Sequence, residues 1–179
     1  FFSHLFCLRQ PAVCCYSTTR STRLLRARAA GLCTMAQGQP RFIDIAANLT
    51  DCVFRGVSWK GQQMHEDDFD MMVQRFRSVG VDKVILSGTS YDVCVKALEL
   101  TRKYPGIFYT TIGVHPAQSL EFEASGDAQE HLDKLRRLIV DNRDVVVALG
   151  EIGIDYAELK ECPKNVQVKY FEAQLGLAQ

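Results

Sequence analysis

The feature of this 179-residue sequence that most limits its fold is a pattern that occurs four times after Pro40. Each repeat has a short run rich in β-branched and aromatic residues, then a loop, then a longer amphipathic segment. Strands that alternate with helices of this length indicate parallel βαβ units. The expected strands lie at 41–47, 82–88, 107–116 and 144–153, and the expected helices lie at 65–80, 90–105, 127–142 and 163–179.

Residues at the ends of the expected helices support these boundaries. Ser90 suits an N-cap, Gly80 and Pro105 suit helix ends, and Pro163 suits a helix start. The apolar runs KVIL and VVVAL do not alternate with polar residues, which is typical of strands covered on both faces. Two folds therefore remain, a doubly wound open sheet and a (β/α) barrel, and periodicity does not separate them.

The charge is unevenly distributed along the chain. Of the 21 Lys and Arg residues, five arginines lie in residues 1–40, where there is no acidic residue. Residues 41–179 therefore carry 16 basic against 21 acidic side chains, a net charge of about −5. This balance argues against a broad basic groove for nucleic acid, but it allows a metal-neutralised phosphate site.

The seven cysteines show no metal-binding spacing, and their number and scatter indicate a reducing compartment. No apolar run reaches the roughly 20 residues of a membrane span.

Residues 1–40 have the Arg- and Ser/Thr-rich composition of a mitochondrial transit peptide. The alternative is that translation of the natural protein starts at Met35, so that residues 1–34 are leader sequence it lacks. The first interpretation predicts a mitochondrial location, and the second predicts the nucleus or cytoplasm. We therefore base the fold prediction on residues 41–179 alone.

Polar side chains follow each expected strand. They are Asp44 to Asn48, Ser87 to Thr89, His115, and Glu151 with Asp155. Since parallel strands open their carboxyl ends on one face, these groups are expected to converge although they are about a hundred residues apart. Neither the GxGxxG nor the GxxxxGK[ST] phosphate-loop motif is present.

Two of these strand ends are the main functional candidates. His115, held by Pro116, can bind a metal or phosphate or move a proton, or it can be an ordinary hydrogen-bonding loop residue. Glu151 leaves an apolar strand between two glycines, so its carboxylate needs a neutralising partner, either a hard divalent cation or a nearby Arg or Lys. Asp155 suits a cap more than a ligand.

Two other polar stretches have simpler interpretations. In DIAANLTD, Asp44 suits a structural role, and Asn48 and Asp51 suit turn and cap positions. In HEDDFD, the acids around His65 are expected to form a solvated first helical turn that complements the helix dipole.

The ordered set FIDIAANLTD, GVHP and GEIGID resembles the TatD family of metal-dependent deoxyribonucleases, and the resemblance covers residues 41–179. It implies a TIM-like (β/α)8 barrel of the metal-dependent hydrolase type that cleaves DNA phosphodiesters with a divalent cation, Mg²⁺ or else Mn²⁺ or Zn²⁺. By this resemblance Glu151 corresponds to the metal-binding glutamate. His115 corresponds to the active-site histidine, and Asp155 corresponds to an aspartate of the same loop, so both enter as catalytic candidates.

The sequence departs from the family pattern in two places. Many relatives have an H-x-H metal-binding pair after the first strand, where this chain has Ala46 and Asn48. The later histidines and the last aspartate of the family belong to strands five to eight, whereas residues 41–179 supply only four βα units. A (β/α)8 barrel needs about 250 residues, so we expect the N-terminal half of a barrel, a truncated chain with little nuclease activity of its own.

Two other functions remain open at this point. One is a non-catalytic truncated isoform that acts by interaction across its open sheet edges. The other is an amidohydrolase-type hydrolase of small molecules. The sequence leaves the oligomeric state open, and no membrane partner is expected.

Overall fold

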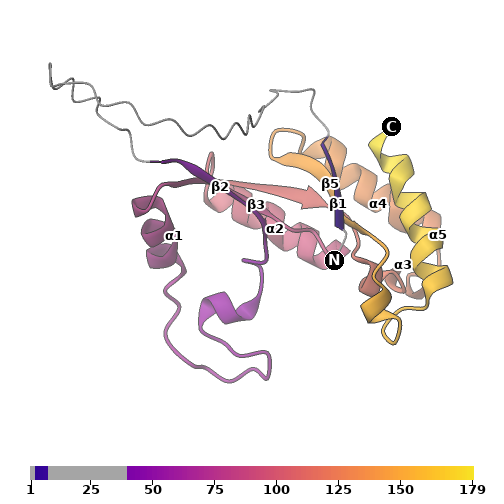
Figure 1. The fold of residues 1–179 in the computed structure, drawn as a ribbon, viewed down its shortest axis with the longest axis horizontal. Helices are drawn as coiled ribbons and strands as arrows, with labels where there is room; N and C mark the ends of the chain where they lie inside the picture. Colours follow the sequence, from indigo (N-terminus) through magenta and orange to yellow (C-terminus); the bar gives the residue numbers. More distant parts are fainter. Residues whose placement is uncertain (1–2, 8–39) are drawn as a thin grey trace, which may run out of the picture.

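The computed structural model describes residues 3–7 and 40–179, so the leader predictions for the rest of the first forty residues lie outside the described residues. The described residues form one five-stranded sheet with helices packed against it (Figure 1). The strands are β1 (Ser3–Cys7), β2 (Phe42–Ala47), β3 (Val81–Leu86), β4 (Phe108–Ile112) and β5 (Val146–Gly153). The α-helices are α1 (Phe69–Ser78), α2 (Tyr91–Lys103), α3 (Glu121–Ala124), α4 (Ala128–Asp141) and α5 (Lys164–Leu175).

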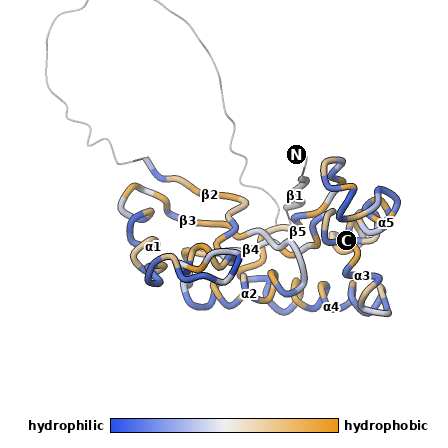
Figure 2. Tube along the Cα trace, turned by 90° about the horizontal axis from the view of Figure 1, so that it is seen from below, coloured by the Kyte–Doolittle hydropathy of each residue, from blue (hydrophilic) through white to orange (hydrophobic). Residues whose placement is uncertain are grey.

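Strands β2 to β5 distinguish between the two folds that the sequence left open. They are parallel and lie side by side in chain order, without the reversal of strand order that a doubly wound sheet requires. Figure 2 shows α1, α2 and α4 on one side of the sheet, as on the outer wall of a barrel. The predicted first four βα units of a TIM-like barrel are confirmed.

The sheet also contains a strand that the sequence analysis did not predict. Strand β1 lies antiparallel to β5, with Ser3 opposite Gly153 and Cys7 opposite Ala148. Because it comes from the first forty residues, it is a strand that the repeat pattern could not indicate.

The ends of the helices agree with the sequence at most positions. The Ser90 hydroxyl accepts a hydrogen bond from the Val93 amide at 3.3 Å, as expected of an N-cap, and α5 begins directly after Pro163. The first helix differs, because it begins at Phe69, so the acids of HEDDFD before it lie outside its first turn. No helix in the described ranges is long and apolar enough to cross a membrane.

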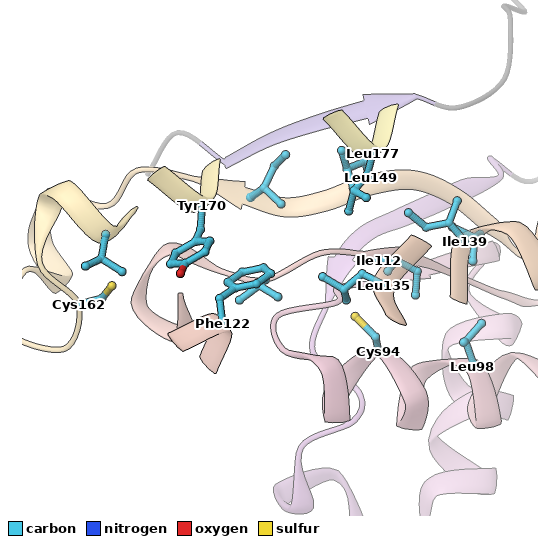
Figure 3. Packing of buried hydrophobic residues seen from close by; sticks show 14 residues of the cluster. Cys94, Leu98, Ile112, Phe122, Leu135, Ile139, Leu149, Cys162, Tyr170 and Leu177 are labelled. Atoms are coloured by element: carbon cyan, nitrogen blue, oxygen red, sulfur yellow. The ribbon is translucent and has the colours of Figure 1, made fainter. Parts of the chain in front are cut away.

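The core consists of two apolar clusters beneath the sheet. The larger one fills the space between β4, β5 and the helices α2, α4 and α5 (Figure 3). Within it the rings of Phe122 and Tyr170 stack with centroids 4.4 Å apart. The smaller cluster joins α1 to β3 and β4 around Phe69 and Phe108, whose rings meet edge to face at 6.3 Å. The two clusters pack the helices against β3, β4 and β5, the strands that lead to the site.

Strand β2 has an unusual surface for a barrel strand. Its burial pattern shows exposed residues from Phe42 to Ala46, and Ile43 and Ile45 are 59% and 61% exposed. In the described sheet β2 is an edge strand that pairs with β3 alone. An apolar edge strand of this kind can pair with further chain.

Candidate functional site

The carboxyl ends of the parallel strands surround an open pocket of about 670 Å³. Residues from four strand ends and the start of α2 line it: Ala46, Asn48, Thr89, Ser90, Val93, His115, Gln118 and Glu151. His115 and Glu151, two of the three predicted site residues, therefore share one pocket. Three lining residues, Ser90, Val93 and Gln118, were not site candidates, although the sequence had marked Ser90 as an N-cap.

Strand β5 carries Glu151 to the pocket. The Glu151 amide donates a hydrogen bond to the Gly88 carbonyl at 2.7 Å, which ties this strand end to the loop after β3. Its half-buried carboxylate has no hydrogen bond and no ion pair among residues 40–179. The arginine or lysine partner that the sequence left open is thus not found in the described chain.

Two glycines let the strand ends approach each other closely. A Cβ on Gly113 would lie 2.7 Å from the Gly150 carbonyl carbon, and a Cβ on Gly88 would lie 2.6 Å from the Thr111 carbonyl oxygen. Both distances are far below a normal contact, so a side chain at either position would push strands apart. The glycine of GVHP is therefore required by the packing of β4 against the peptide before Glu151.

Backbone and side-chain hydrogen bonds hold His115 in place. Its amide donates to the Thr89 carbonyl at 2.8 Å, and its carbonyl accepts from the Gln118 amide at 2.8 Å. The ring atom Nδ1 accepts a hydrogen bond from the Ala117 amide at 3.2 Å. The imidazole of GVHP is thus oriented by the turn that Pro116 begins.

The Nδ1 hydrogen bond determines the proton position of the neutral ring. Because Nδ1 accepts from an amide, the neutral imidazole of His115 carries its proton on Nε2. Nε2 has no partner within residues 40–179. An Nε2–H group suits donation to a phosphate oxygen better than coordination of a metal, which needs a lone pair.

The two positions that replace the H-x-H pair also lie at the pocket. Ala46 has a left-handed backbone with a φ of 59°, within an irregular part of the β2–β3 register. Asn48 accepts a hydrogen bond from the Asp51 amide through its backbone carbonyl, the turn role expected for it. Asn48 lines the pocket, and its side chain carries an amide oxygen that can act as a ligand.

Asp155 is not among the pocket residues with His115 and Glu151. Its carboxylate accepts a hydrogen bond from the Ala157 amide at 2.8 Å and caps the short helix Tyr156–Glu158. It does not line the pocket. The structure therefore places it in the capping role that the sequence favoured for such an aspartate, and its catalytic role stays a prediction.

Other polar clusters lie outside the pocket. Asp68 of HEDDFD pairs with Arg75 at 2.8 Å, and this hydrogen bond lowers the pKa of its exposed carboxyl. Burial raises the pKa of the Cys94 thiol to about 12, which excludes it as a nucleophile near neutral pH. No group of three or more His, Cys, Asp or Glu side chains in the described ranges could hold a metal ion.

Comparison with known proteins places this geometry in a family. A family model described as TatD related DNase matches residues 43–179. The chain is 40% identical over 141 residues to a protein named deoxyribonuclease Tat-D from Schizosaccharomyces pombe, covering 77% of this chain and 45% of that relative. It is 34% identical to a 3'-5' ssDNA/RNA exonuclease TatD from Edwardsiella piscicida, covering 76% and 45%.

Solved structures agree with the sequence comparison. A TatD family hydrolase from Entamoeba histolytica superimposes with a TM-score of 0.69 at 37% identity, covering 76% of this chain and 45% of that one. An uncharacterised amidohydrolase from Saccharomyces cerevisiae gives a TM-score of 0.68 at 30% identity, covering 77% and 44%. The chain spans about half the length of the relatives it matches. It belongs to the TatD related DNase family.

Proposed function

We propose that the whole protein is a metal-dependent deoxyribonuclease that hydrolyses phosphodiester bonds of DNA. The observation that carries the proposal is the Glu151 carboxylate, which has no partner within residues 40–179 and lies in the same pocket as His115. A half-buried carboxylate without a protein partner is a natural cation ligand. The named activities of the relatives support the choice of DNA as substrate.

Glu151 and the side-chain oxygen of Asn48 are the groups of this chain that would hold the cation. Oxygen donors suit Mg²⁺ best, with Mn²⁺ or Zn²⁺ as alternatives. A bound divalent cation supplies Lewis-acid polarisation of the phosphate and lowers the pKa of a bound water. Because the described residues hold no group of three acidic, His or Cys donors, we propose that further ligands come from the half of the relatives' length that this chain does not span.

His115 has a different role in this proposal. Its Nε2–H would donate a hydrogen bond to a non-bridging oxygen of the scissile phosphate, where negative charge builds up in the transition state. The hydrogen bond from the Ala117 amide to Nδ1 keeps the proton on Nε2 and sets the ring orientation. His115 is then an electrostatic stabiliser, and the mildly acidic surface is no obstacle because the cation supplies positive charge at the phosphate.

The proposal is tested by DNA cleavage in Mg²⁺ or Mn²⁺ with a full-length form and its Glu151→Ala variant. Outer ligands of metal sites are worth about 10- to 100-fold, so loss of a direct ligand should reduce the rate by more than about 100-fold. Glu161→Ala, which removes an exposed carboxylate from the loop before α5, should leave the rate unchanged. Equal cleavage by the wild type and Glu151→Ala would refute the assignment.

A second candidate is an interaction function for the 179-residue chain itself. The exposed apolar residues of β2 favour it, since they form an edge that another chain can cover. In this case the chain would cleave DNA far more slowly than a full-length form. Cleavage at a comparable rate would exclude the non-catalytic interpretation.

A further inference from the structure

Helix α5 carries two glutamines in the protein core. Gln167 is fully buried and Gln174 is 1% exposed. The two lie seven residues apart, about two helical turns, so they face the same side of α5. Buried amides are costly unless both their donor and acceptor are paired, and a methionine of similar length would fill the same space without this cost.

Gln174 binds the backbone directly before His115. Its Oε1 accepts a hydrogen bond from the Val114 amide at 2.7 Å, and its Nε2 donates to the Val114 carbonyl at 3.1 Å. Strand β4 ends at Ile112, so Val114 lies beyond the end of the strand. The side chain of Gln174 thus replaces a strand neighbour at the position next to the site histidine.

Gln167 makes the corresponding contacts in the loop after Glu151. Its Oε1 accepts from the Asp155 amide at 2.8 Å, and its Nε2 donates to the carbonyls of Asp155 at 3.1 Å and Cys162 at 2.9 Å. Strand β5 ends at Gly153, so these bonds also begin where the strand stops. Both glutamines therefore use the oxygen and the nitrogen of their amide to bind backbone beyond a strand end.

We propose that Gln174 and Gln167 are positioning residues, which hold the His115 loop and the loop after Glu151 at fixed places on α5. A bidentate amide fixes both the distance and the rotation of the peptide unit it binds, which an apolar contact cannot do. The strand ends at the pocket are then placed by a helix that contributes no residue to the pocket wall. Only the expected effect of these glutamines on DNA cleavage rests on the proposed function.

Backbone amide exchange of the 179-residue chain, followed by NMR, tests the positioning role. Loss of one buried hydrogen bond costs about 1 kcal/mol, which corresponds to about fivefold, so Gln174→Met should lower the protection factor of the Val114 amide by about fivefold and leave that of the Asp155 amide unchanged. Gln167→Met should show the opposite pattern. Each variant is the control of the other, since general destabilisation would affect both amides equally. Equal effects, or none, would overturn the proposal.

The position of the histidine provides a second readout. In Gln174→Met the ring signals of His115 should shift, whereas Tyr170→Phe should leave them in place. Tyr170 lies on α5 between the two glutamines, and its hydroxyl bonds to Glu123 at 3.4 Å, so this control removes a polar group without touching the pocket loops. Unmoved His115 signals in Gln174→Met would contradict the role.

A third variant keeps the test decisive if Gln174→Met fails to fold. Gln174→Glu offers an acceptor and a donor while its carboxyl is protonated, and loses the donor when it ionises. Ionisation leaves the acceptor of the Val114 amide in place but sets a buried carboxylate against the Val114 carbonyl oxygen. The loop should then be held less tightly, so the Val114 protection factor should match the wild type at low pH and decline as the pH rises. A protection factor that is independent of pH would count against the bond pattern.

Cleavage kinetics of a full-length form separate this proposal from the proposed function. If the wild type cleaves DNA, Gln174→Met should lower kcat by about tenfold and Tyr170→Phe should not. If the wild type cleaves no DNA, the nuclease assignment fails, and the reciprocal exchange pattern still decides whether the glutamines hold the loops.

Discussion

Gly113 shows how one residue without a side chain can determine the position of a neighbouring pocket residue, Glu151. Its Cα faces the peptide between Gly150 and Glu151, so β4 and β5 approach more closely there than any larger residue allows. The same contact presents the Glu151 carboxylate to the pocket. A larger residue at Gly113 would therefore change the shape of the pocket, although Gly113 has no side chain to contribute to it.

We predict that Gly113→Ala destabilises the fold by about 2 kcal/mol, the typical cost of overpacking a close contact. The physical reason is the 2.7 Å approach of the new Cβ to Gly150. Urea unfolding measures the effect. Gly176→Ala is the control, because the added Cβ would have no neighbouring atom within 4 Å and the φ of Gly176, −64°, is helical. The control should be neutral or slightly stabilising, and a Gly113→Ala variant as stable as this control would show that the strand ends are loosely packed.

At the scale of elements, a partly buried polar pair joins three helices. Glu121 of α3 accepts hydrogen bonds from His131 of α4 at 2.8 Å and from the Tyr91 amide at the start of α2 at 3.1 Å. Burial raises the pKa of the Glu121 carboxyl, and nearby Asp92 acts in the same direction, against the smaller opposing effect of the two hydrogen bonds. The carboxyl is thus less easily ionised in the folded chain than in the unfolded chain.

This shift has a defined consequence for stability. A raised folded-state pKa means that the contribution of Glu121 is complete below its ordinary pKa of 4.5 and is lost as the pH rises through the raised value. Glu121→Gln keeps an acceptor without a charge, so it should remove this loss. We expect the free energy of unfolding of the variant relative to wild type to increase from pH 4 to pH 7, as measured by urea titration at each pH. The exposed Glu130→Gln should give no such trend, and a constant difference for Glu121→Gln would contradict the prediction.

The sequence predicted the helices and strands well where a local signal existed. The N-cap at Ser90 and the start of α5 after Pro163 rest on residues next to the helix ends, and both are confirmed. The predicted start of the first helix, His65, lies four residues before its observed start at Phe69. The reason is that acids that precede a helix and acids in its first turn look alike in sequence. Strand β1 carries no part of the repeat and was therefore missed.

The pocket was predictable only in part for a similar reason. His115 and Glu151 follow apolar strands, so their positions at one sheet edge could be inferred from the fold. Gln167 and Gln174 act from a helix on loops that lie 12 and 60 residues away in the chain. No spacing rule connects such pairs, and their pairing depends on how α5 packs against β4 and β5.

At the scale of the whole molecule, the four βα units form a curved half-barrel with an apolar edge. Ile43 and Ile45 of β2 are more than half exposed, and Phe42 beside them is 51% exposed. Burial of apolar surface gives roughly 25 cal/mol per Å², so this edge favours association. We expect the 179-residue chain to self-associate in a concentration-dependent way.

Size exclusion with light scattering at several concentrations measures this association. The double substitution Ile43→Lys with Ile45→Lys should shift the chain toward the monomer, because charged side chains disfavour edge pairing. Val79→Lys is the matched control, since Val79 is 64% exposed but lies after α1 and outside the sheet. A monomer at all concentrations in the wild type, or an equal effect of the control, would count against pairing through β2.

Strand β1 has a consequence for the opposite edge of the sheet. Its antiparallel pairing occupies the outer hydrogen-bonding groups of β5, where the next strand of a barrel would have to run parallel. The two arrangements are mutually exclusive, so any incoming strand competes with one tethered to the same chain. Such a tether gives β1 a high effective concentration at that edge. Closure of a barrel past β5 is therefore an exchange of one strand for another rather than a simple addition.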